Sequence, residues 1–182
     1  MKKKSAFTII EVVLVLAIAG LIFLMVFIAL PALQRNQRNT QRRQDLSRIS
    51  SALIEYTANN SGRLPFGSDE IGEYFDVDFV PKYLDSSCNS ETEYLNSDSL
   101  PAYPFSCSGD GFRDPSGKEY VIINADIAGE FGFDGLKAEL GDIYVSDEAG
   151  CSEDGFGYYA GQKSKYAISI RLEGGAWYCL DN

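Results

Sequence analysis

The chain has 182 residues, a net charge of −10 at neutral pH and no histidine. Without histidine it lacks the commonest general base and the commonest metal ligand, and it also lacks a glycine-rich phosphate loop and an H-E-x-x-H motif. These absences exclude the usual enzyme classes, so we expect a protein that is not an enzyme.

A long apolar run follows the short basic stretch MKKKSA. The 19 residues from Val12 to Leu30 carry no charge, which is close to the roughly 20 residues that a helix needs to cross a bilayer. No small-residue cleavage site follows Leu30, so the sequence predicts that this segment is retained. Glu11 lies at the edge of the run, where a carboxylate is costly, about 2.5–3.5 kcal/mol at the bilayer centre. We therefore expect Glu11 to have a partner or a function.

Beyond the apolar run the pattern becomes amphipathic and then ends. Turn formers in ANNSG and then Pro65 mark the end, so residues 7–59 are predicted to form one helix. Gly20 and Pro31 are its weak points, and we expect a bend because proline cannot donate the backbone hydrogen bond. The second half carries an apolar stripe at helical spacing: Leu46, Ile49, Leu53 and Tyr56.

The residues after the helix divide into a loop-rich part and a strand-rich part. Five of the six prolines lie between Pro65 and Pro115, and Asp114-Pro115-Ser116-Gly117 predicts a turn. Strands are predicted at residues 119–127 and 142–146. Residues 165–182 predict a terminal hairpin with Tyr166, Ile168 and Ile170 on one face and Glu173-Gly174-Gly175 in the turn. We expect the helix stripe to pack under this antiparallel sheet, in an α+β fold.

The chain contains four cysteines, and none of them forms a C-x-x-C pair. An even number of cysteines after a membrane segment indicates two disulfides in an oxidising compartment. Four cysteines allow three pairings, and the residues leave these open. The positive-inside rule does not orient the segment, because basic residues flank both ends. The cysteines instead favour a cytoplasmic N-terminus. They are Cys88, Cys107, Cys151 and Cys179.

Charge along the chain is uneven: residues 1–60 carry +5 and residues 61–182 carry −15. The basic stretch RNQRNTQRRQ, residues 35–44, is expected to face anionic headgroups or neighbouring acidic heads, and no specific nucleic acid is predicted. Carboxylates in loops can bind calcium, but NADIAGEFGFDG lacks EF-hand ligands at the required positions. We expect no metal site and no cofactor, with calcium as the alternative. The acidic clusters are Asp110, Asp114, Asp142, Asp147, Glu148, Glu153 and Asp154.

The segment KKKSAFTIIEVVLVLAIAGLI resembles the class III signal peptide of the type IV pilin superfamily, with a basic leader, a small residue, Phe-Thr-Ile-Ile-Glu and an apolar helix. The resemblance covers residues 2–60. It implies that a prepilin peptidase cuts between Ala6 and Phe7, and that the new amine of Phe7 is N-methylated. Most members have glycine where this chain has Ala6. In filaments of the family, Glu11 would neutralise the Phe7 amine of a neighbouring subunit, and the helix would melt between Gly20 and Pro31.

The resemblance also implies an architecture, with a long helix packed under a globular head. Cys151 and Cys179 are similar to the C-terminal disulfide loop of many pilins, which leaves Cys88 and Cys107 as the second pair. The expected parts are a leader at residues 1–6, a transmembrane or filament-core helix at 7–33, an amphipathic helix at 34–60 and an extracytoplasmic head at 61–182.

The expected function is that of a structural subunit, a major or minor pilin, in a type IV filament for adhesion, twitching motility or DNA uptake. Its partners would be copies of itself, other minor pilins, the prepilin peptidase and the pilus assembly machinery. It would be a single-pass precursor in the cytoplasmic membrane and then part of an extracellular pilus. Two alternatives remain: a pseudopilin of a type II secretion system, and a membrane-anchored binding protein that does not polymerise.

Overall fold

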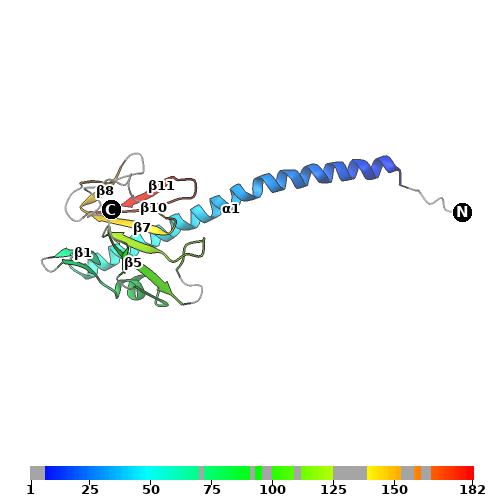
Figure 1. The fold of residues 1–182 in the computed structure, drawn as a ribbon. Helices are drawn as coiled ribbons and strands as arrows, with labels where there is room; N and C mark the ends of the chain where they lie inside the picture. Colours follow the sequence, from blue (N-terminus) through cyan, green and yellow to red (C-terminus); the bar gives the residue numbers. More distant parts are fainter. Residues whose placement is uncertain are drawn as a thin grey trace. The chain divides into compact units, whose positions relative to one another are not determined.

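The computed structural model describes residues 7–69, 72–90, 93–95, 100–108, 112–124, 139–152, 158–160 and 165–182. The chain divides into two compact units, residues 1–37 and 38–182. Helix α1 (Ile9–Asn59) begins in the first unit and ends in the second, and short strands make up most of the remaining described chain (Figure 1). The predicted long helix and the α+β class are both confirmed.

The strands of the second unit form one large sheet and two hairpins. In the large sheet the order is β11-β10-β7-β6-β5-β3, and β4 also pairs with β5. One hairpin is β1 (Phe66–Asp69) with β2 (Gly72–Phe75), and the other is β8 (Ala149–Cys151) with β9 (Tyr158–Ala160). A short π-helical turn, η1 (Val80–Leu84), precedes the sheet. The sheet strands are β3 (Cys88–Ser90), β4 (Glu93–Leu95), β5 (Leu100–Cys107), β6 (Val121–Asn124), β7 (Asp142–Asp147), β10 (Tyr166–Arg171) and β11 (Trp177–Asp181).

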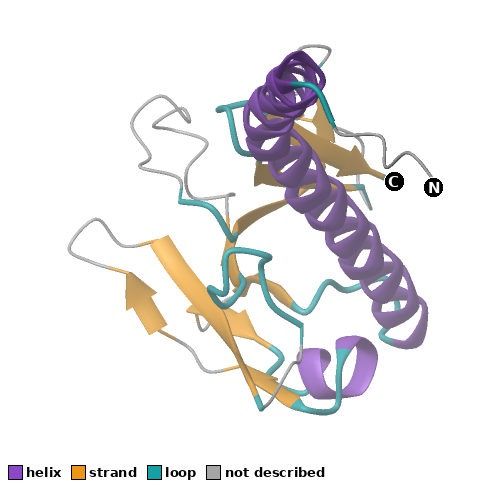
Figure 2. Cartoon of the chain, turned by 90° about the vertical axis from the view of Figure 1, so that its right-hand side faces the viewer, coloured by secondary structure: helices purple, strands orange, loops and turns teal. Residues whose placement is uncertain are grey.

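The hydrophobic core lies between the second half of α1 and the sheet (Figure 2). The predicted helix stripe is buried there as a whole, from Leu46 to Tyr56. On the sheet, Tyr166, Ile168 and Ile170 of β10 enter the same core, as their alternation predicted. Their neighbours Ala167 and Ser169 are buried as well, so the opposite face of β10 is also covered.

The part before residue 118 was predicted to be loop-rich, and this is wrong, because strands β1 to β5 lie there. Prolines argue against a central strand, since they cannot donate to a neighbour. In β5 the amide of Phe105 donates to the carbonyl of Tyr120 on the β6 side, 2.8 Å away. The nitrogen of Pro104 therefore points to the opposite edge of β5, where β3 and β4 pair. Residues 100–102 of β5 pair with β4 and residues 105–107 pair with β3, so Pro104 lies in the gap between these two partners. The strand thus accommodates Pro104 without losing a ladder bond.

The sheet is not entirely antiparallel, since β6 and β7 run parallel. A parallel pair needs a crossover of a dozen or more residues, and residues 125–141 provide that length. The predicted strand 142–146 is confirmed as β7. The strand predicted at 119–127 is confirmed only for β6, because residues 125–127 lie outside the described chain.

Both predicted turns are present and approach α1. In the turn at Asp114, the amide of Gly117 donates to the carbonyl of Asp114 over 2.8 Å, and Gly117 has φ 88°. In the terminal hairpin, Gly174 and Gly175 have φ 101° and 91°, a conformation that favours glycine. These two turns place Asp114 and Glu173 beside the helix.

Candidate functional site

The first unit begins with a polar cap on α1. The backbone N–H of Thr8 donates to Oε2 of Glu11 over 3.1 Å, and the Thr8 hydroxyl donates to the same oxygen over 3.0 Å. The N–H of Glu11 donates in return to Oγ1 of Thr8 over 3.4 Å. This reciprocal pair is a capping box, which satisfies orphan N–H groups at a helix start. Sequence reasoning singled out Glu11 but missed Thr8, although T-x-x-E before an apolar run is a known signal.

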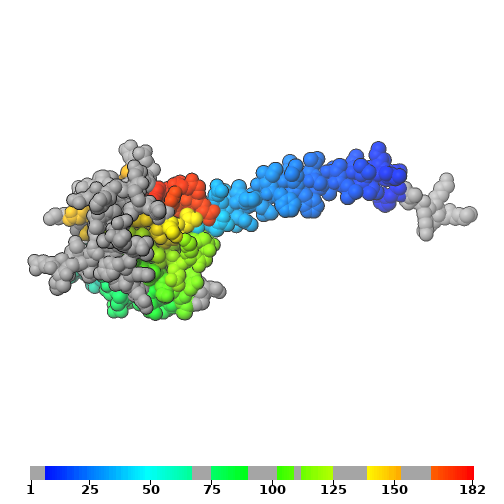
Figure 3. All heavy atoms as spheres, viewed as in Figure 1, coloured from blue at the N-terminus to red at the C-terminus, as the bar shows by residue number. Residues whose placement is uncertain are grey.

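In the first unit α1 is a single helix whose side chains lie at its own surface (Figure 3). The large apolar side chains from Phe7 to Leu33 are each between 43% and 86% exposed. By length and composition α1 is able to cross a membrane. It continues unbroken through Gly20 and Pro31, so the bend or melting at these residues stays a prediction. Ala6 lies outside the described residues.

The four cysteines form two disulfides, in the pairing that the resemblance implied. Cys88 and Cys107 join β3 to β5 and are buried in the core. Cys151 and Cys179 join β8 to β11 and are only half-buried. Both disulfides therefore connect strands within the second unit.

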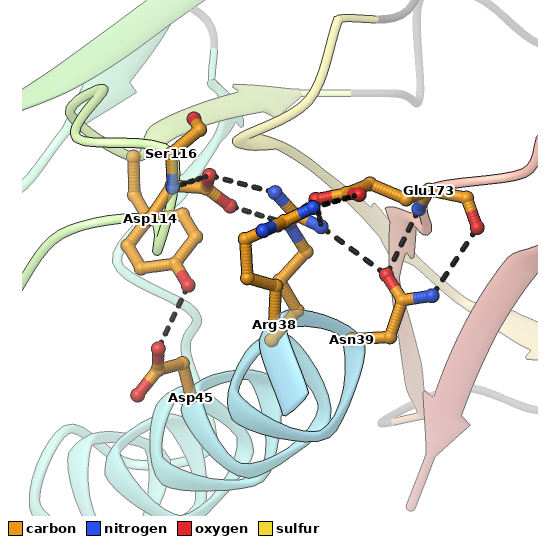
Figure 4. Close-up of polar contacts among 8 residues, drawn as sticks. Arg38, Asn39, Asp45, Asp114, Ser116 and Glu173 are labelled. Atoms are coloured by element: carbon orange, nitrogen blue, oxygen red, sulfur yellow. Dashed lines mark hydrogen bonds and ion pairs between the residues drawn. The ribbon is translucent and has the colours of Figure 1, made fainter. Parts of the chain in front are cut away.

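A second polar site lies where α1 enters the second unit (Figure 4). We call it the arginine cluster, and it consists of Arg38, Asn39, Arg42, Asp114 and Glu173. Arg38 donates from Nε and Nη2 to the two carboxylate oxygens of Glu173, over 2.5 and 2.7 Å. Asn39 contacts the backbone of Glu173 twice, accepting from its N–H over 2.9 Å and donating to its carbonyl over 3.2 Å.

Arg42 is the centre of the cluster, and its side chain is completely buried. It donates from Nε and Nη2 to both oxygens of Asp114, over 2.6 and 2.9 Å. Its Nη1 donates to Glu173 over 3.1 Å and to Asn39 over 3.2 Å. Four of its five N–H groups are thus engaged, as a buried guanidinium requires.

Electrostatics in the cluster follow from these contacts. The hydrogen bonds from Arg38, with a smaller contribution from Arg42, lower the pKa of Glu173 to about 2. Burial acts to raise the pKa of Asp114, but Arg42 and the amide of Ser116 outweigh it, so this pKa is lowered. Both carboxylates are therefore charged at neutral pH, and the two arginines compensate their charge.

Asp45 lies one helical turn further along α1 and behaves differently. Its carboxylate accepts a hydrogen bond from the Tyr120 hydroxyl over 2.8 Å, and its nearest cation is Arg48 at 3.9 Å. Burial raises the pKa of Asp45 above its ordinary value, despite the opposing effect of Tyr120. The helix therefore carries one buried carboxylate that is only partly compensated.

Sequence reasoning missed the arginine cluster. It assigned the whole stretch 35–44 to headgroups or neighbouring heads, and for Arg38 and Arg42 this is wrong, since both bind acids of their own chain. The spacing along the helix could have predicted that Arg42 is buried. Arg42 lies four residues before Leu46 and so continues the buried stripe. The partner Asp114 was assigned to a turn and to an acidic cluster, and its pairing with Arg42 was not predicted.

The acidic clusters give no metal site within the described part of the chain. Asp142 accepts the N–H of Glu139, and Asp147 accepts the N–H of Glu148. Three of the acidic residues, Asp110, Glu153 and Asp154, lie outside the described residues, as does most of NADIAGEFGFDG. Calcium binding in these loops stays a prediction.

Comparison with known proteins identifies the N-terminal segment. Residues 1–27 match the family model described as the prokaryotic N-terminal methylation motif. No curated protein and no solved structure was found to match the chain. The matched range contains the basic leader, Phe7 and Glu11, on which the resemblance rested. The chain therefore carries a prokaryotic N-terminal methylation motif, the class III signal peptide of type IV pilins, at the start of a long apolar helix, which supports a type IV pilin or pseudopilin-like precursor.

Proposed function

We propose that the chain is a structural subunit of a type IV pilus-like filament, made as a membrane-anchored precursor. One observation carries the proposal: a single helix has an apolar half whose large side chains are exposed among the described residues, and a second half that is buried in a disulfide-bonded head. The apolar half also lies in the matched methylation motif. Lipid covers such a surface before assembly, and the same segments of neighbouring subunits cover it afterwards.

Processing would begin with cleavage between Ala6 and Phe7, which removes the three lysines of the leader. Those lysines have no place in a packed apolar bundle, because an unpaired buried charge is very costly. The amine of Phe7 would then be N-methylated by the enzyme that acts on this motif. The prepilin peptidase and the assembly machinery of the membrane are thus the first partners.

In the filament, Glu11 would pair with the Phe7 amine of a neighbouring subunit. The bonds from Thr8 both end on Oε2 of Glu11. A carboxylate has about four acceptor sites on two oxygens, so it can hold the helix cap and accept an ammonium group as well. Charge-assisted bonds of this kind are stronger than neutral ones. Glu11 would therefore have one partner in the precursor and two in the assembly.

The head would lie on the oxidising side of the membrane, because both disulfides lie in it. It would face outwards in the filament, together with copies of itself and other minor pilins. The two disulfides favour an exposed filament over the short periplasmic piston of a type II secretion system. Adhesion, twitching motility and DNA uptake are the roles that such a filament serves.

Intact-mass analysis of the membrane protein, expressed with and without a prepilin peptidase, tests the proposal. With the peptidase we expect a chain that begins at Phe7 and carries one added methyl group. Without it, the chain should begin at Met1. Ala6→Arg is the control, since a bulky charged residue at the cut should block cleavage. A chain that keeps its leader beside an active peptidase would contradict the assignment to pilins and favour a simple membrane anchor.

A further inference from the structure

The arginine cluster connects three segments that are far apart in the sequence. Arg38 and Arg42 come from α1, Asp114 comes from the turn between β5 and β6, and Glu173 comes from the turn of the terminal hairpin. Arg38 and Asn39 are also the first two residues of the second unit. The cluster is therefore placed where a pull on α1 from its N-terminal side first reaches the head.

The cluster contributes ion pairs to the contact between α1 and the rest of the head. Further along the helix the contact is made mainly by fully buried apolar side chains such as Leu46, Ile49 and Leu53, together with single hydrogen bonds such as the one that Asp45 accepts. Apolar burial is not directional, so it opposes a small slip of the helix only weakly. Hydrogen bonds weaken steeply with distance and angle, so they oppose the same slip over a fraction of an ångström.

The two acidic partners are held in different ways, Asp114 by its own turn and Glu173 by three residues of α1. The Asp114 carboxylate accepts the N–H of Ser116 over 2.8 Å, which fixes its turn. Glu173 is bound through its side chain by Arg38 and Arg42, and through its backbone by Asn39. A load on Arg42 is thus passed to two separate parts of the sheet, one on each side of β7 in the strand order, and a load on Arg38 is passed to the terminal hairpin.

We propose that the arginine cluster is a mechanical latch, which transmits tension from α1 into the head and keeps the head from being pulled off the helix. This inference rests on the proposed function, because a filament that is held through its apolar helices is what places α1 under tension. The latch itself is a property of the single chain. The terminal hairpin and the turn at Asp114 are its two anchor points.

Glu173→Gln is the variant of choice for a test. Glu173 is at a turn and its side chain is 16% exposed, so the variant should still fold, whereas a change at Arg42 would leave a buried charge. Glu139→Gln is the matched control. Glu139 pairs with Lys118 at 2.5 Å, but both residues are exposed and neither belongs to α1.

The experiment is single-molecule force spectroscopy on the full chain in detergent micelles, at constant force. In the first geometry the handles are attached at the N-terminus and the C-terminus. In the second geometry the N-terminal handle is moved to a clickable side chain at position 82, where the exposed Lys82 lies in the head outside α1. Only the first geometry loads the start of α1.

In the first geometry, Glu173→Gln should shorten the lifetime of the folded head by about tenfold or more, because it removes the charge from the bonds that resist displacement of α1. In the second geometry its effect should be less than about twofold. Glu139→Gln should change neither lifetime. If Glu173→Gln shortened the lifetime equally in both geometries, the cluster would be an ordinary stabilising contact and the proposal would be wrong. An unchanged lifetime in the first geometry would also contradict the proposal. Failure to form filaments would contradict the proposed function but would leave these lifetimes unchanged.

Discussion

In the first half of α1 the large apolar side chains up to Leu33 are at least 43% exposed, whereas Leu46, Ile49 and Leu53 in the second half are fully buried. The backbone is the same continuous helix in both halves. The first half is apolar on every side, and the second has a single buried stripe. An amphipathic helix needs one covering surface, while a helix that is apolar all round needs lipid or other helices around it.

Polar residues show the same contrast. In the first half, Glu11 is satisfied by Thr8 within a single turn of helix, and its carboxylate is exposed. In the second half, Arg42 is completely buried and bound to acids more than 70 residues away in the sequence. The polar contacts of the first half are therefore local, whereas those of the second half join distant parts of the chain.

The largest effect on the head is expected from Arg42→Ala. The change leaves the buried Asp114 without its counter-charge, which typically costs about 3–5 kcal/mol. Urea unfolding of the full chain in detergent, followed by fluorescence of the single tryptophan, Trp177, measures this. Circular dichroism should still report the helix of the first half. Arg43→Ala is the control: Arg43 lies over the Tyr178 ring at 5.2 Å, and its loss should cost no more than about 1 kcal/mol.

Removal of a disulfide should have the next largest effect. Cys151 and Cys179 are 28 residues apart, so the double change to alanine should lower the free energy of unfolding by about 3–4 kcal/mol in the chain-entropy model. Mild reductant should also open this half-buried bond before the buried one between Cys88 and Cys107. Peptide mapping after alkylation gives the order of opening. The reverse order would show that the core around Cys88 is less closed than its burial indicates.

A smaller effect is expected from pH. The pKa of Glu173 is lowered from 4.5 to about 2, and that of Asp114 is lowered too, so the stability they add is present above pH 4.5 and is lost as the pH falls towards 2. The raised pKa of Asp45 acts in the opposite direction, since its protonation favours the folded head. Urea midpoints between pH 5 and 2 should therefore fall less steeply for Glu173→Gln. An unchanged slope in that variant would contradict the ion pairs of Glu173.

Sequence reasoning found the parts of the molecule that repeat with a simple period. The stripe from Leu46 to Tyr56 and the alternation in β10 are such patterns, and the structure confirms them. The strand β5 was not predicted because a proline such as Pro104 fits a strand only where no neighbouring strand needs its N–H. Here that place is the gap between β3 and β4, which only the tertiary pairing reveals. The arginine cluster was not predicted for a related reason. Arg42 continues the stripe, but its partners are brought to it by two turns distant in the sequence.

Glu11→Val provides the most direct test of the contrast between the two halves. The change removes a charge that disfavours the bilayer, so membrane insertion should be unchanged or improved. The head should fold as before, because every residue of its core lies beyond residue 45. Filaments, recovered by shearing and counted by electron microscopy against the protein in the membrane fraction, should be lost, since the Phe7 amine of the next subunit would be buried without a counter-charge. Glu11→Asp should give an intermediate yield. A normal yield of filaments from Glu11→Val would contradict the account.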